Sequence, residues 1–382
     1  MKLIRGLILP IFVLLLHVTQ APAQQKAPLS WTLGWDADWV TAVSFLDNQR
    51  IAAGNKLGQI LVWKLSEKMG EPAPSLRLDG HSNTINRLLT SPDGLLISAS
   101  NDHTIRIWDT GKPAKGSDTI VLNDSARRDK LERKQKPPVA VEAKVQVIDA
   151  SRVLSGHKDW ILGLSLTKDG KTLVSGDNKG EIIVWDMPDA REKRRLKTKG
   201  WVWAMAVSPR GESLLIADRI HLVFDSGRHA GLQLLDMKTG GVQRDLSKDK
   251  DFAKHMYAAA AFSPDGKIAA VARGGEVDGL NGKVTLLDPA TGKKIRELTP
   301  GHLNGATDVV FHPDGKHLFS SGRDTTVRMW KVDDGKLARE FGQPRGGQFK
   351  DWIHAVAVSP DGRWLAGADM AGAVRIWSLG SR

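Results

Sequence analysis

The sequence predicts an all-β fold, a seven-bladed β-propeller whose blades are four-stranded antiparallel sheets. One pattern recurs seven times: an apolar strand, a turn that often contains Pro-Asp-Gly, a second strand, and a third strand that ends in Trp or Leu. Because a unit of this length cannot bury its apolar face alone, the copies must pack on one another. The seven third strands end at Trp63, Trp108, Trp185, Leu235, Leu287, Trp330 and Trp377.

The spacing between these ends indicates the number of blades. Five of the six intervals lie between 43 and 52 residues, which is close to the length of a four-stranded propeller blade. The interval from Trp108 to Trp185 is 77 residues long, so it is expected to hold one blade and a polar insertion at 112–144. The propeller is therefore predicted to span 29–380 as one domain.

The sixth copy shows the order of the strands, which we call a to d. Strand a is predicted at 309–311, strand b at 317–320, strand c at 327–330 and strand d at 337–341. The a–b turn recurs as Ser91-Pro92-Asp93-Gly94, Ser263-Pro264-Asp265-Gly266, His312-Pro313-Asp314-Gly315 and Ser359-Pro360-Asp361-Gly362. Proline presets φ for such a turn, and glycine accepts the positive φ that branched residues resist.

The two ends of the repeat region predict how the ring closes. The last copy stops after its strand c, at 377–379, whereas a spare apolar strand at 29–33 precedes the first copy. We expect the N-terminal strand to pair with the last blade as its strand d. Closure of this kind removes the exposed sheet edges that invite aggregation.

The N-terminus and the composition predict export. Lys2 and Arg5 precede an apolar run at 7–16, and Ala21-Pro22-Ala23 fits a cleavage site, so 1–23 is predicted to be a cleaved signal peptide. An uncleaved membrane anchor is the alternative, but the run is short for a span and no later segment reaches that length. The chain has no cysteine and a net charge of +12, which favours contact with anionic envelope polymers over nucleic acid. We expect an exported protein that is periplasmic or secreted.

Two short motifs indicate a family. Gly-His precedes strand a at Gly80-His81, Gly156-His157 and Gly301-His302, and Trp-Asp closes strand c at Trp108-Asp109 and Trp185-Asp186. These motifs resemble those of the WD-repeat (WD40) β-propeller family, and the chain is similar to a bacterial-type exported member across 29–380.

The resemblance implies that the His and Asp residues that recur in the blades have a structural role. In blades 2 and 6 it implies hydrogen-bonded networks of His81, Asp102, Trp108 and of His302, Asp324, Trp330, completed by Ser98 or Ser100 and by Ser320 or Ser321. A catalytic role is the alternative, but a buried network that is satisfied internally needs no substrate. Blades 4 and 5 lack Gly-His and are inferred from spacing and the turn alone.

Equivalent positions of the seven copies predict a binding face around the mouth of the central channel. The first column, at the start of strand a, is Trp39, Thr84, Trp160, Trp201, Met256, Gly305 and Trp352. The second column, two residues on, is Thr41, Asn86, Leu162, Trp203, Ala258, Thr307 and His354. The resemblance implies that this top face holds partner peptides, and Trp is enriched at such sites. We expect contacts from Trp203 and His354 above all, with Arg323 beside them; packing between blades is the alternative for the first column.

Two long b–c connections break the symmetry of the top face. The connection in blade 4 is expected at 218–231 and includes Arg219, His221, Arg228 and His229, and that in blade 5 is expected at 273–282 and includes Glu276 and Asp278. Together they could form one wall over the channel, since long loops on a rigid scaffold often carry specificity. Solvated loops are the alternative. The spacing of the His, Glu and Asp residues matches no tight ligand motif, so no metal site is predicted.

Two basic segments are candidates for binding a polyanion. The insertion at 112–144 is expected to hang from blade 2, ahead of a strand d at 145–154, and a second basic run lies at 191–199. Both are predicted on the bottom side of adjacent blades, where they could bind an anionic polymer through salt-sensitive charge; a solvated surface is the alternative. The candidate residues are Arg127, Arg128, Lys130, Arg133, Lys134, Lys193, Arg194 and Arg195. Aromatic residues are absent from both segments, so nucleic acid is an unlikely partner.

These patterns predict a binding protein and not an enzyme. No Ser nucleophile motif, pair of catalytic carboxylates or phosphate loop occurs in the sequence, and no cofactor is expected. We expect a monomeric scaffold that binds another protein or peptide of the cell envelope through its top face. The alternatives are a small-ligand-binding or hydrolytic propeller that uses the channel mouth, and adhesion to an anionic envelope polymer.

Overall fold

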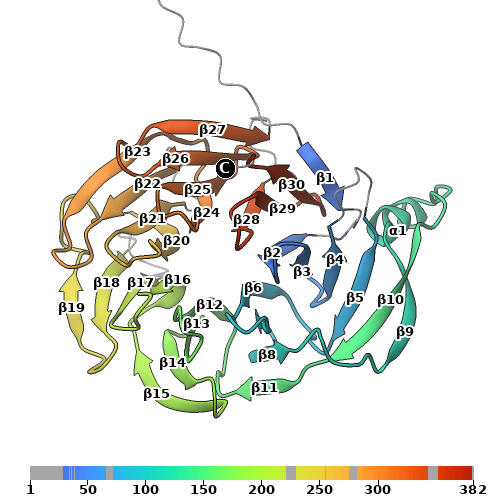
Figure 1. Cartoon of the computed structure of the whole chain (residues 1–382), viewed down its shortest axis with the longest axis horizontal. Helices are drawn as coiled ribbons and strands as arrows, with labels where there is room; N and C mark the ends of the chain where they lie inside the picture. The colour runs from blue at the N-terminus through green and yellow to red at the C-terminus, as the bar shows by residue number, and fades with distance from the viewer. Residues whose placement is uncertain are drawn as a thin grey trace, which may run out of the picture.

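The computed structural model confirms the seven-bladed β-propeller (Figure 1). It describes residues 29–33, 35, 37, 39–65, 72–220, 229–253, 255–274, 282–342 and 352–380. The predicted signal peptide at 1–23 lies outside these residues. Among the residues that the structure describes, no helix is long and apolar enough to cross a membrane.

The blades follow one another around the ring in sequence order (Figure 1). Blade 1 contains β2 (Val40–Phe45), β3 (Arg50–Asn55), β4 (Ile60–Lys64) and β5 (Pro74–Asp79). Blade 2 contains β6 (Ile85–Thr90), β7 (Leu96–Ser100), β8 (Thr104–Trp108) and β11 (Arg152–Ser155). Blade 3 contains β12 (Ile161–Leu166), β13 (Thr172–Asp177), β14 (Glu181–Asp186) and β15 (Arg191–Lys197). Blades 4 and 5 contain β16 (Trp201–Val207), β17 (Ser213–Ile220), β18 (His229–Asp236) and β19 (Val242–Asp245); and β20 (Tyr257–Phe262), β21 (Ala269–Arg273), β22 (Gly282–Leu287) and β23 (Lys294–His302).

The last two blades show how the ring closes. Blade 6 contains β24 (Ala306–Phe311), β25 (His317–Gly322), β26 (Thr326–Lys331) and β27 (Leu337–Gly342). Blade 7 contains β28 (Ile353–Val358), β29 (Trp364–Asp369), β30 (Val374–Ser378) and the N-terminal β1 (Leu29–Leu33). Strand β1 pairs antiparallel with β30, with Leu33 opposite Val374, so the predicted closure is confirmed.

The a–b turns form as their residue types require. Their glycines, from Gly94 to Gly362, have φ between 67° and 83°, a conformation that side chains with a Cβ adopt rarely. In four blades a Ser or Thr hydroxyl at the first turn position donates a hydrogen bond to the turn Asp. These bonds fix the turn before strand b starts.

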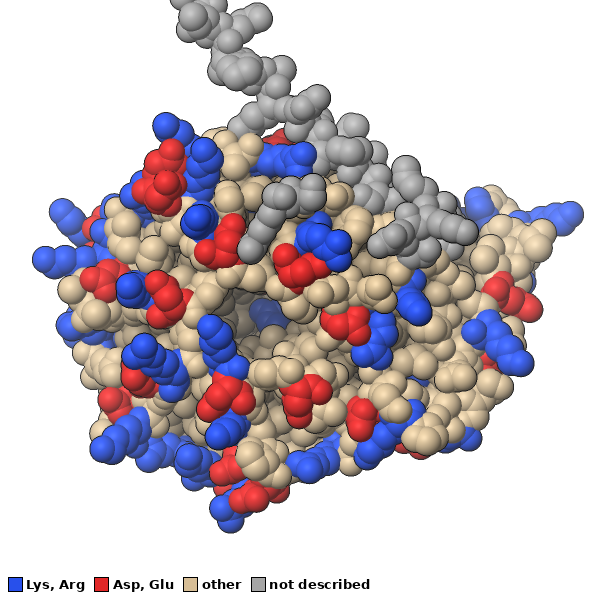
Figure 2. Space-filling view, in the orientation of Figure 1, with Lys and Arg blue, Asp and Glu red and all other residues tan. Residues whose placement is uncertain are grey.

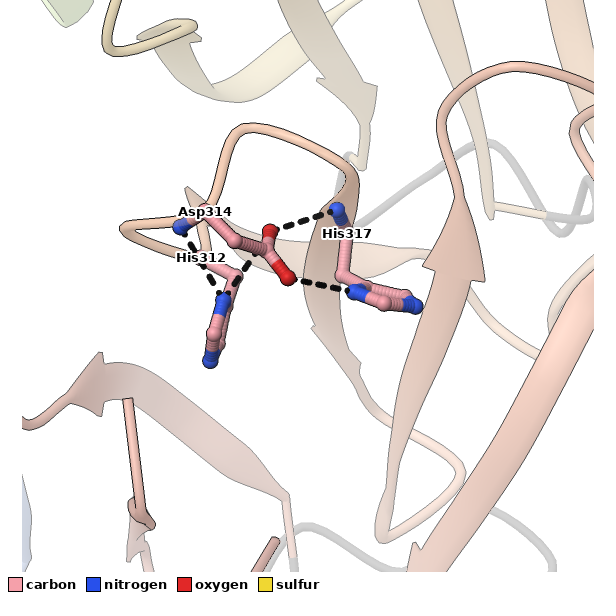
Figure 3. A group of neighbouring side chains, drawn as sticks. All are labelled: His312, Asp314 and His317. Atoms are coloured by element: carbon pink, nitrogen blue, oxygen red, sulfur yellow. Dashed lines mark hydrogen bonds and ion pairs between the residues drawn. The ribbon is translucent and has the colours of Figure 1, made fainter. Parts of the chain in front are cut away.

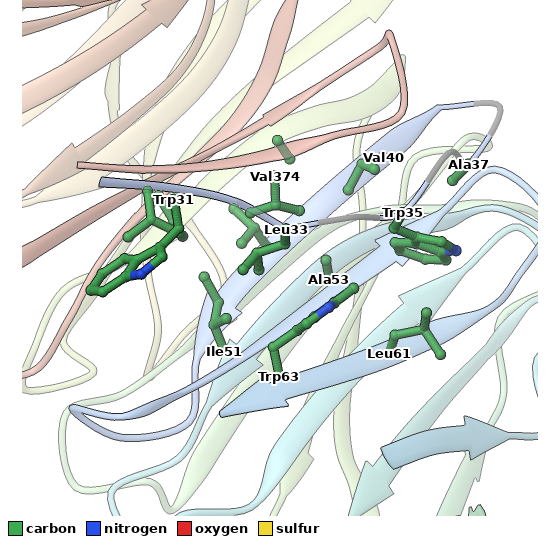
Figure 4. Close-up of a cluster of buried hydrophobic side chains, with 14 of the residues drawn as sticks. Trp31, Leu33, Trp35, Ala37, Val40, Ile51, Ala53, Leu61, Trp63 and Val374 are labelled. Atoms are coloured by element: carbon green, nitrogen blue, oxygen red, sulfur yellow. The ribbon is translucent and has the colours of Figure 1, made fainter. Parts of the chain in front are cut away.

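Within the described residues the core consists of seven hydrophobic clusters, each at the contact between two successive blades. The cluster between blades 7 and 1 is the largest and includes residues of β1 (Figure 4). There Leu33 and Trp31 pack beside Val374, and Trp35 lies 5.6 Å from Trp63 between ring centroids. The N-terminal segment therefore stabilises the ring both through its ladder with β30 and through this cluster.

The insertion does not hang from blade 2 as predicted. Strand β10 (Glu142–Asp149) pairs parallel with β5, and β9 (Gly116–Val121) pairs antiparallel with β10, so both strands extend the sheet of blade 1 to six strands. The interpretation of 145–154 as one strand d is wrong in its first half, because only β11 completes blade 2. The chain leaves blade 2 after β8, adds two strands and helix α1 (Asp124–Glu132) to blade 1, and then returns.

Candidate binding site at the top face

The histidines of the three Gly-His motifs lie in closed hydrogen-bond networks. In blade 2, Trp108 Nε1 donates to Ser98 Oγ at 2.9 Å, Ser98 Oγ lies 2.7 Å from His81 Nε2, and His81 Nδ1 lies 2.7 Å from the Asp102 carboxylate. Burial lowers the pKa of His81, with the hydrogen bond to Asp102 opposing this, so a neutral ring can accept from Ser98 and donate to Asp102. The structure thus selects Ser98, and not Ser100, as the fourth member.

Blades 3 and 6 repeat the arrangement. Blade 6 joins His302, Asp324, Ser320 and Trp330. Blade 3 joins His157, Asp177, Ser175 and Trp185. Each network resembles a Ser-His-Asp triad, but Ser98, Ser175 and Ser320 are each 0% exposed and each accepts an indole N–H. A hydroxyl that no substrate can reach cannot act as a nucleophile, so these groups hold the blades together.

The top face is the side where each strand d leads to the next strand a and where the b–c turns lie. A repeated hydrogen bond establishes the first column there: the residue that follows strand b donates its N–H to the column residue's carbonyl. The carbonyls of Trp39, Thr84, Trp160, Met256, Gly305 and Trp352 accept in this way. In blade 4 the column residue Trp201 instead pairs with Arg219 of an extended ladder.

The four Trp residues of the first column differ in exposure. Trp160 is 46% exposed, whereas Trp352 is 8% exposed beneath the Arg323 guanidinium, which lies 4.3 Å from its ring centroid. Trp39 and Trp201 are partly exposed, and Lys56 Nζ lies 4.4 Å from the Trp39 ring centroid. A cation over an indole face is an attractive contact. Trp160 therefore presents the largest free aromatic surface of the column.

The second column is the β-bulge of strand a in every blade. Each strand a pairs with strand b through a register shift that leaves one residue unpaired, and these residues are Thr41, Asn86, Leu162, Trp203, Ala258, Thr307 and His354. A bulge re-aims its side chain out of the regular alternation of the strand. The seven bulges consequently direct their side chains differently from the apolar residues on either side of them.

Four of the bulge residues connect neighbouring blades. Thr41 donates to the carbonyl of Ile85 at 2.5 Å, Asn86 donates to that of Ile161 at 2.7 Å, and Thr307 donates to that of Ile353. His354 Nδ1 lies 3.1 Å from the carbonyl of Thr41 and so joins blade 7 to blade 1. The column thus has a structural role in blades 1, 2, 6 and 7, whereas Leu162, Trp203 and Ala258 occupy it in blades 3 to 5.

The charges near His354 determine its ionisation. Burial, followed by the positive charges of Arg87 and Arg323, lowers the pKa of His354 to about 4, although the Thr41 carbonyl opposes the shift. At neutral pH the ring is therefore uncharged and its Nδ1–H donates to Thr41. The prediction that His354 and Trp203, which is partly exposed, contact a partner stays a prediction.

The central channel contains a cavity of about 800 Å³, lined by the strands a and the a–b turns. Figure 2 shows the hollow at the centre of the disc, with a Lys or Arg side chain at its depth. Arg87 and Asp308 are among the charged residues of the lining. The Asp308 carboxylate accepts from the Val356 N–H at 3.0 Å and from the Val309 N–H at 2.9 Å, and its burial raises its pKa.

The long connection in blade 4 begins later than predicted. Three further pairs, Asp218–Gly231, Arg219–Ala230 and Ile220–His229, extend the β17–β18 ladder, so Arg219 and His229 belong to strands. His221 and Arg228 lie outside the described residues, as do Glu276 and Asp278 of the blade 5 connection. The hairpin extends blade 4 on the top face, since its strands pair up to residues 220 and 229.

The two basic segments do not form one surface. Helix α1, which carries Arg127, Arg128 and Lys130, belongs to the extension of blade 1, with Arg133 and Lys134 directly after it. Strand β15, which carries Lys193, Arg194 and Arg195, belongs to blade 3, and Figure 1 shows blade 2 between them. Several of these charges are already paired, for example Arg128 with Asp124 and Arg195 with Glu181 and Glu192. The prediction of adjacent basic blades is wrong because the insertion joins blade 1; polymer binding itself stays a prediction.

Sequence reasoning missed Asp177, Arg87 and Asp308. Asp177 stands in the same order after Gly-His as Asp102 and Asp324, so the repeat could have identified it. Arg87 and Asp308 both follow a bulge residue directly, but nothing in the residue pattern marks the bulge. Their place in the channel becomes visible only when the strands a are brought together.

The closed ring is a seven-bladed β-propeller with indole–Ser–His–Asp networks in blades 2, 3 and 6. Four segments, 72–109, 149–186, 292–331 and 342–378, match the family model described as WD domain, G-beta repeat. These four segments are therefore similar to WD40 repeats. Three of the matched segments contain strand d of one blade and strands a to c of the next, so the sequence repeat is offset from the blade by one strand. The fourth, 342–378, begins at the last residue of β27 and ends with strand c of blade 7.

Three relatives match this chain at low sequence identity. The chain is 28% identical to the nuclear distribution protein nudF of Emericella nidulans, over 69% of this chain and 43% of the relative. It is 24% identical to the ribosome biogenesis protein YTM1 of Vanderwaltozyma polyspora, over 77% and 65%, and 24% identical to the guanine nucleotide-binding protein subunit beta of Zea mays, over 69% and 66%. The chain thus spans about two thirds or less of each of these three relatives. They come from fungi and a plant, so they give no support to the bacterial-type exported resemblance.

Proposed function

We propose that this chain is a non-enzymatic scaffold that binds another protein, or a peptide segment of one, through the top face of its propeller. The exposed indole of Trp160 carries the proposal, since 46% of this large side chain faces solvent directly before β12. Burial of an exposed Trp by a partner contributes strongly to affinity, and such residues dominate many interfaces.

Two further features support a top-face interface. The extended β17–β18 hairpin breaks the symmetry of the ring on the same face, which gives a partner a unique orientation. The name of the maize relative, a subunit of a guanine nucleotide-binding protein, describes a member of an assembly. The buried serines of the triad-like networks support a role without catalysis.

The test is a binding measurement with a partner captured from the native source and then purified. We expect Trp160→Ala and Trp203→Ala each to weaken binding at least about tenfold, because each removes a large apolar contact. Val242→Ala is the matched control: Val242 is 54% exposed on β19, an outer strand, and should leave the dissociation constant unchanged. Full affinity in both Trp variants would reject the top face as the interface.

We further propose that the scaffold works in the cell envelope after export. Lys2, Arg5 and the apolar run at 7–16 support this location. N-terminal sequencing of the protein from its native source is expected to begin at Gln24. A mature protein that still begins at Met1 would contradict export by this route.

A further inference from the structure

The a–b turn of blade 6 departs from the other turns of the chain at two positions. Where blades 2, 3, 5 and 7 place a Ser or Thr that donates to the turn Asp, blade 6 places His312. The second position is the residue whose carbonyl accepts from the N–H of the first turn residue. Blade 6 places His317 there, whereas blades 2, 3, 4, 5 and 7 carry Leu95, Thr172, Ser213, Ile268 and Trp364. The two changes place one histidine on each side of the Asp314 carboxylate.

The three side chains converge on one point (Figure 3). His312 Nδ1 lies 3.0 Å from one oxygen of Asp314, and His317 Nδ1 lies 2.9 Å from the other. All three ligand atoms lie within 4.8 Å of one another. Ligand atoms bonded at about 2.1 Å to one ion are about 3.0 Å apart when their bonds meet at a right angle, and the two distances between imidazole and carboxylate are close to this value.

The turn holds the Asp314 carboxylate in place. This carboxylate accepts from the Lys316 N–H at 2.7 Å and from the His317 N–H at 3.1 Å. Its orientation is fixed by the backbone that follows it.

His312 has an outer partner of the kind that metal ligands use. Its Nε2 lies 3.0 Å from the carbonyl of Gly362, in the turn of blade 7, and its side chain is 8% exposed. An Nε2–H that donates to this carbonyl leaves Nδ1 without a proton, and Nδ1 accepts from the Asp314 N–H at 3.2 Å. The contact with Gly362 orients the imidazole as ligating imidazoles are oriented, and an ion at Nδ1 would replace the Asp314 N–H as the partner of that nitrogen. A Cβ at Gly362 would lie 2.4 Å from His312 Nε2, so this glycine permits the approach.

We propose that His312, Asp314 and His317 bind a divalent transition-metal ion of the Zn²⁺, Ni²⁺ or Cu²⁺ class. Two imidazole nitrogens and a carboxylate suit these ions, whereas Mg²⁺ and Ca²⁺ prefer oxygen ligands. The His317 side chain is 26% exposed, which leaves one side of the site open to solvent for entry and for water ligands. Because His312 contacts blade 7, the ion strengthens the contact between the turns of blades 6 and 7.

The test is a titration of untagged, chelator-treated protein with Zn²⁺ by isothermal calorimetry. We expect one saturable equivalent and a higher thermal midpoint in the presence of Zn²⁺, since a ligand that binds only the folded state stabilises it. His317→Thr restores the residue that blade 3 carries at this position, and Asp314→Asn keeps the turn acceptors. Each is expected to weaken Zn²⁺ binding at least about tenfold.

The matched control is His103→Asn, which removes a histidine from the b–c turn of blade 2, where φ is +69° and Asn is readily accepted. This variant should bind Zn²⁺ as the unaltered protein does. Absence of saturable Zn²⁺ binding by the unaltered protein would overturn the proposal. So would unchanged affinity in either Asp314→Asn or His317→Thr, whose folding is checked by their thermal melts without metal.

Discussion

At the scale of single residues, His354 shows how a side chain at the channel mouth also closes the ring. Its Nδ1 donates to the Thr41 carbonyl, which links the last blade to the first across 313 positions of sequence. The same column in blade 2 carries Asn86, whose amide makes the equivalent bond to blade 3. The second-column position therefore carries a side chain that donates a hydrogen bond at the contacts between blades 1 and 2, 2 and 3, 6 and 7, and 7 and 1.

The lowered pKa of His354 predicts acid sensitivity. Because the folded pKa of about 4 lies below the ordinary value of 6.5, the unfolded chain binds the proton more tightly. The contribution to stability is complete above about pH 6.5 and is lost as pH falls toward 4. His354→Asn keeps a donor for Thr41 and should lose less free energy of unfolding than the unaltered protein over this range, by about 2 kcal/mol. Denaturant unfolding at several pH values measures it; parallel pH curves for the two proteins would contradict the assignment.

The positions of many of these side chains could be predicted from the repeat, but the bulges and Asp308 could not. Counting equivalent positions identified both columns, whereas the resemblance to a family implied the networks of blades 2 and 6. The count could not show that the second column is a bulge, because an unpaired residue in strand a leaves the apolar pattern around it intact. Asp308 was missed for the same reason, since the groups that donate to its carboxylate are backbone N–H groups of its own blade and the next.

At the scale of elements, the insertion is the main departure from the repeat. Ile120, Leu122 and Ala143 of this segment pack in the cluster between blades 7 and 1, although α1 itself buries no residue. The sequence could not assign β10 to a sheet: its alternating pattern suits the antiparallel edge of blade 2 as well as the parallel edge of blade 1. Only the turn at 150–151 separates β10 from β11, and that turn has no strong residue signal.

The packing of the insertion predicts unequal effects of two similar substitutions. Leu122 is 8% exposed and contributes to the cluster between blades 7 and 1, whereas Leu131 of α1 is 57% exposed. Leu122→Ala should lower the free energy of unfolding by about 2 kcal/mol, because it leaves a cavity. Leu131→Ala is the matched control and should change it by less than about 0.5 kcal/mol. Equal effects in denaturant unfolding would mean that the insertion does not pack on blade 1.

At the scale of the whole molecule, stability depends on every blade having two neighbours. Each hydrophobic cluster lies between two blades, so opening the ring at one contact exposes apolar surface on both sides of the break. The chain is discontinuous within blade 7, between β30 and β1. There the ladder of β1 with β30 replaces the covalent link between strands c and d that the other blades have, and the His354 bond and the shared cluster strengthen the contact between blades 7 and 1.

This arrangement predicts that loss of β1 destabilises the entire propeller and not only blade 7. Deletion of 29–34 removes Trp31 and Leu33, which are 6% and 0% exposed, and leaves β30 as an open edge. We expect one cooperative thermal transition at a markedly lower midpoint. The smaller change Leu33→Ala should lower the free energy of unfolding by about 3 kcal/mol, and Thr32→Ala, at a partly exposed position of the same strand, serves as its control. A melt of the deleted protein that matches the full chain would show that the ring stays closed without β1. A separate early transition would show that blade 7 unfolds alone. We do not expect this outcome, because blades 6 and 1 each share a hydrophobic cluster with blade 7.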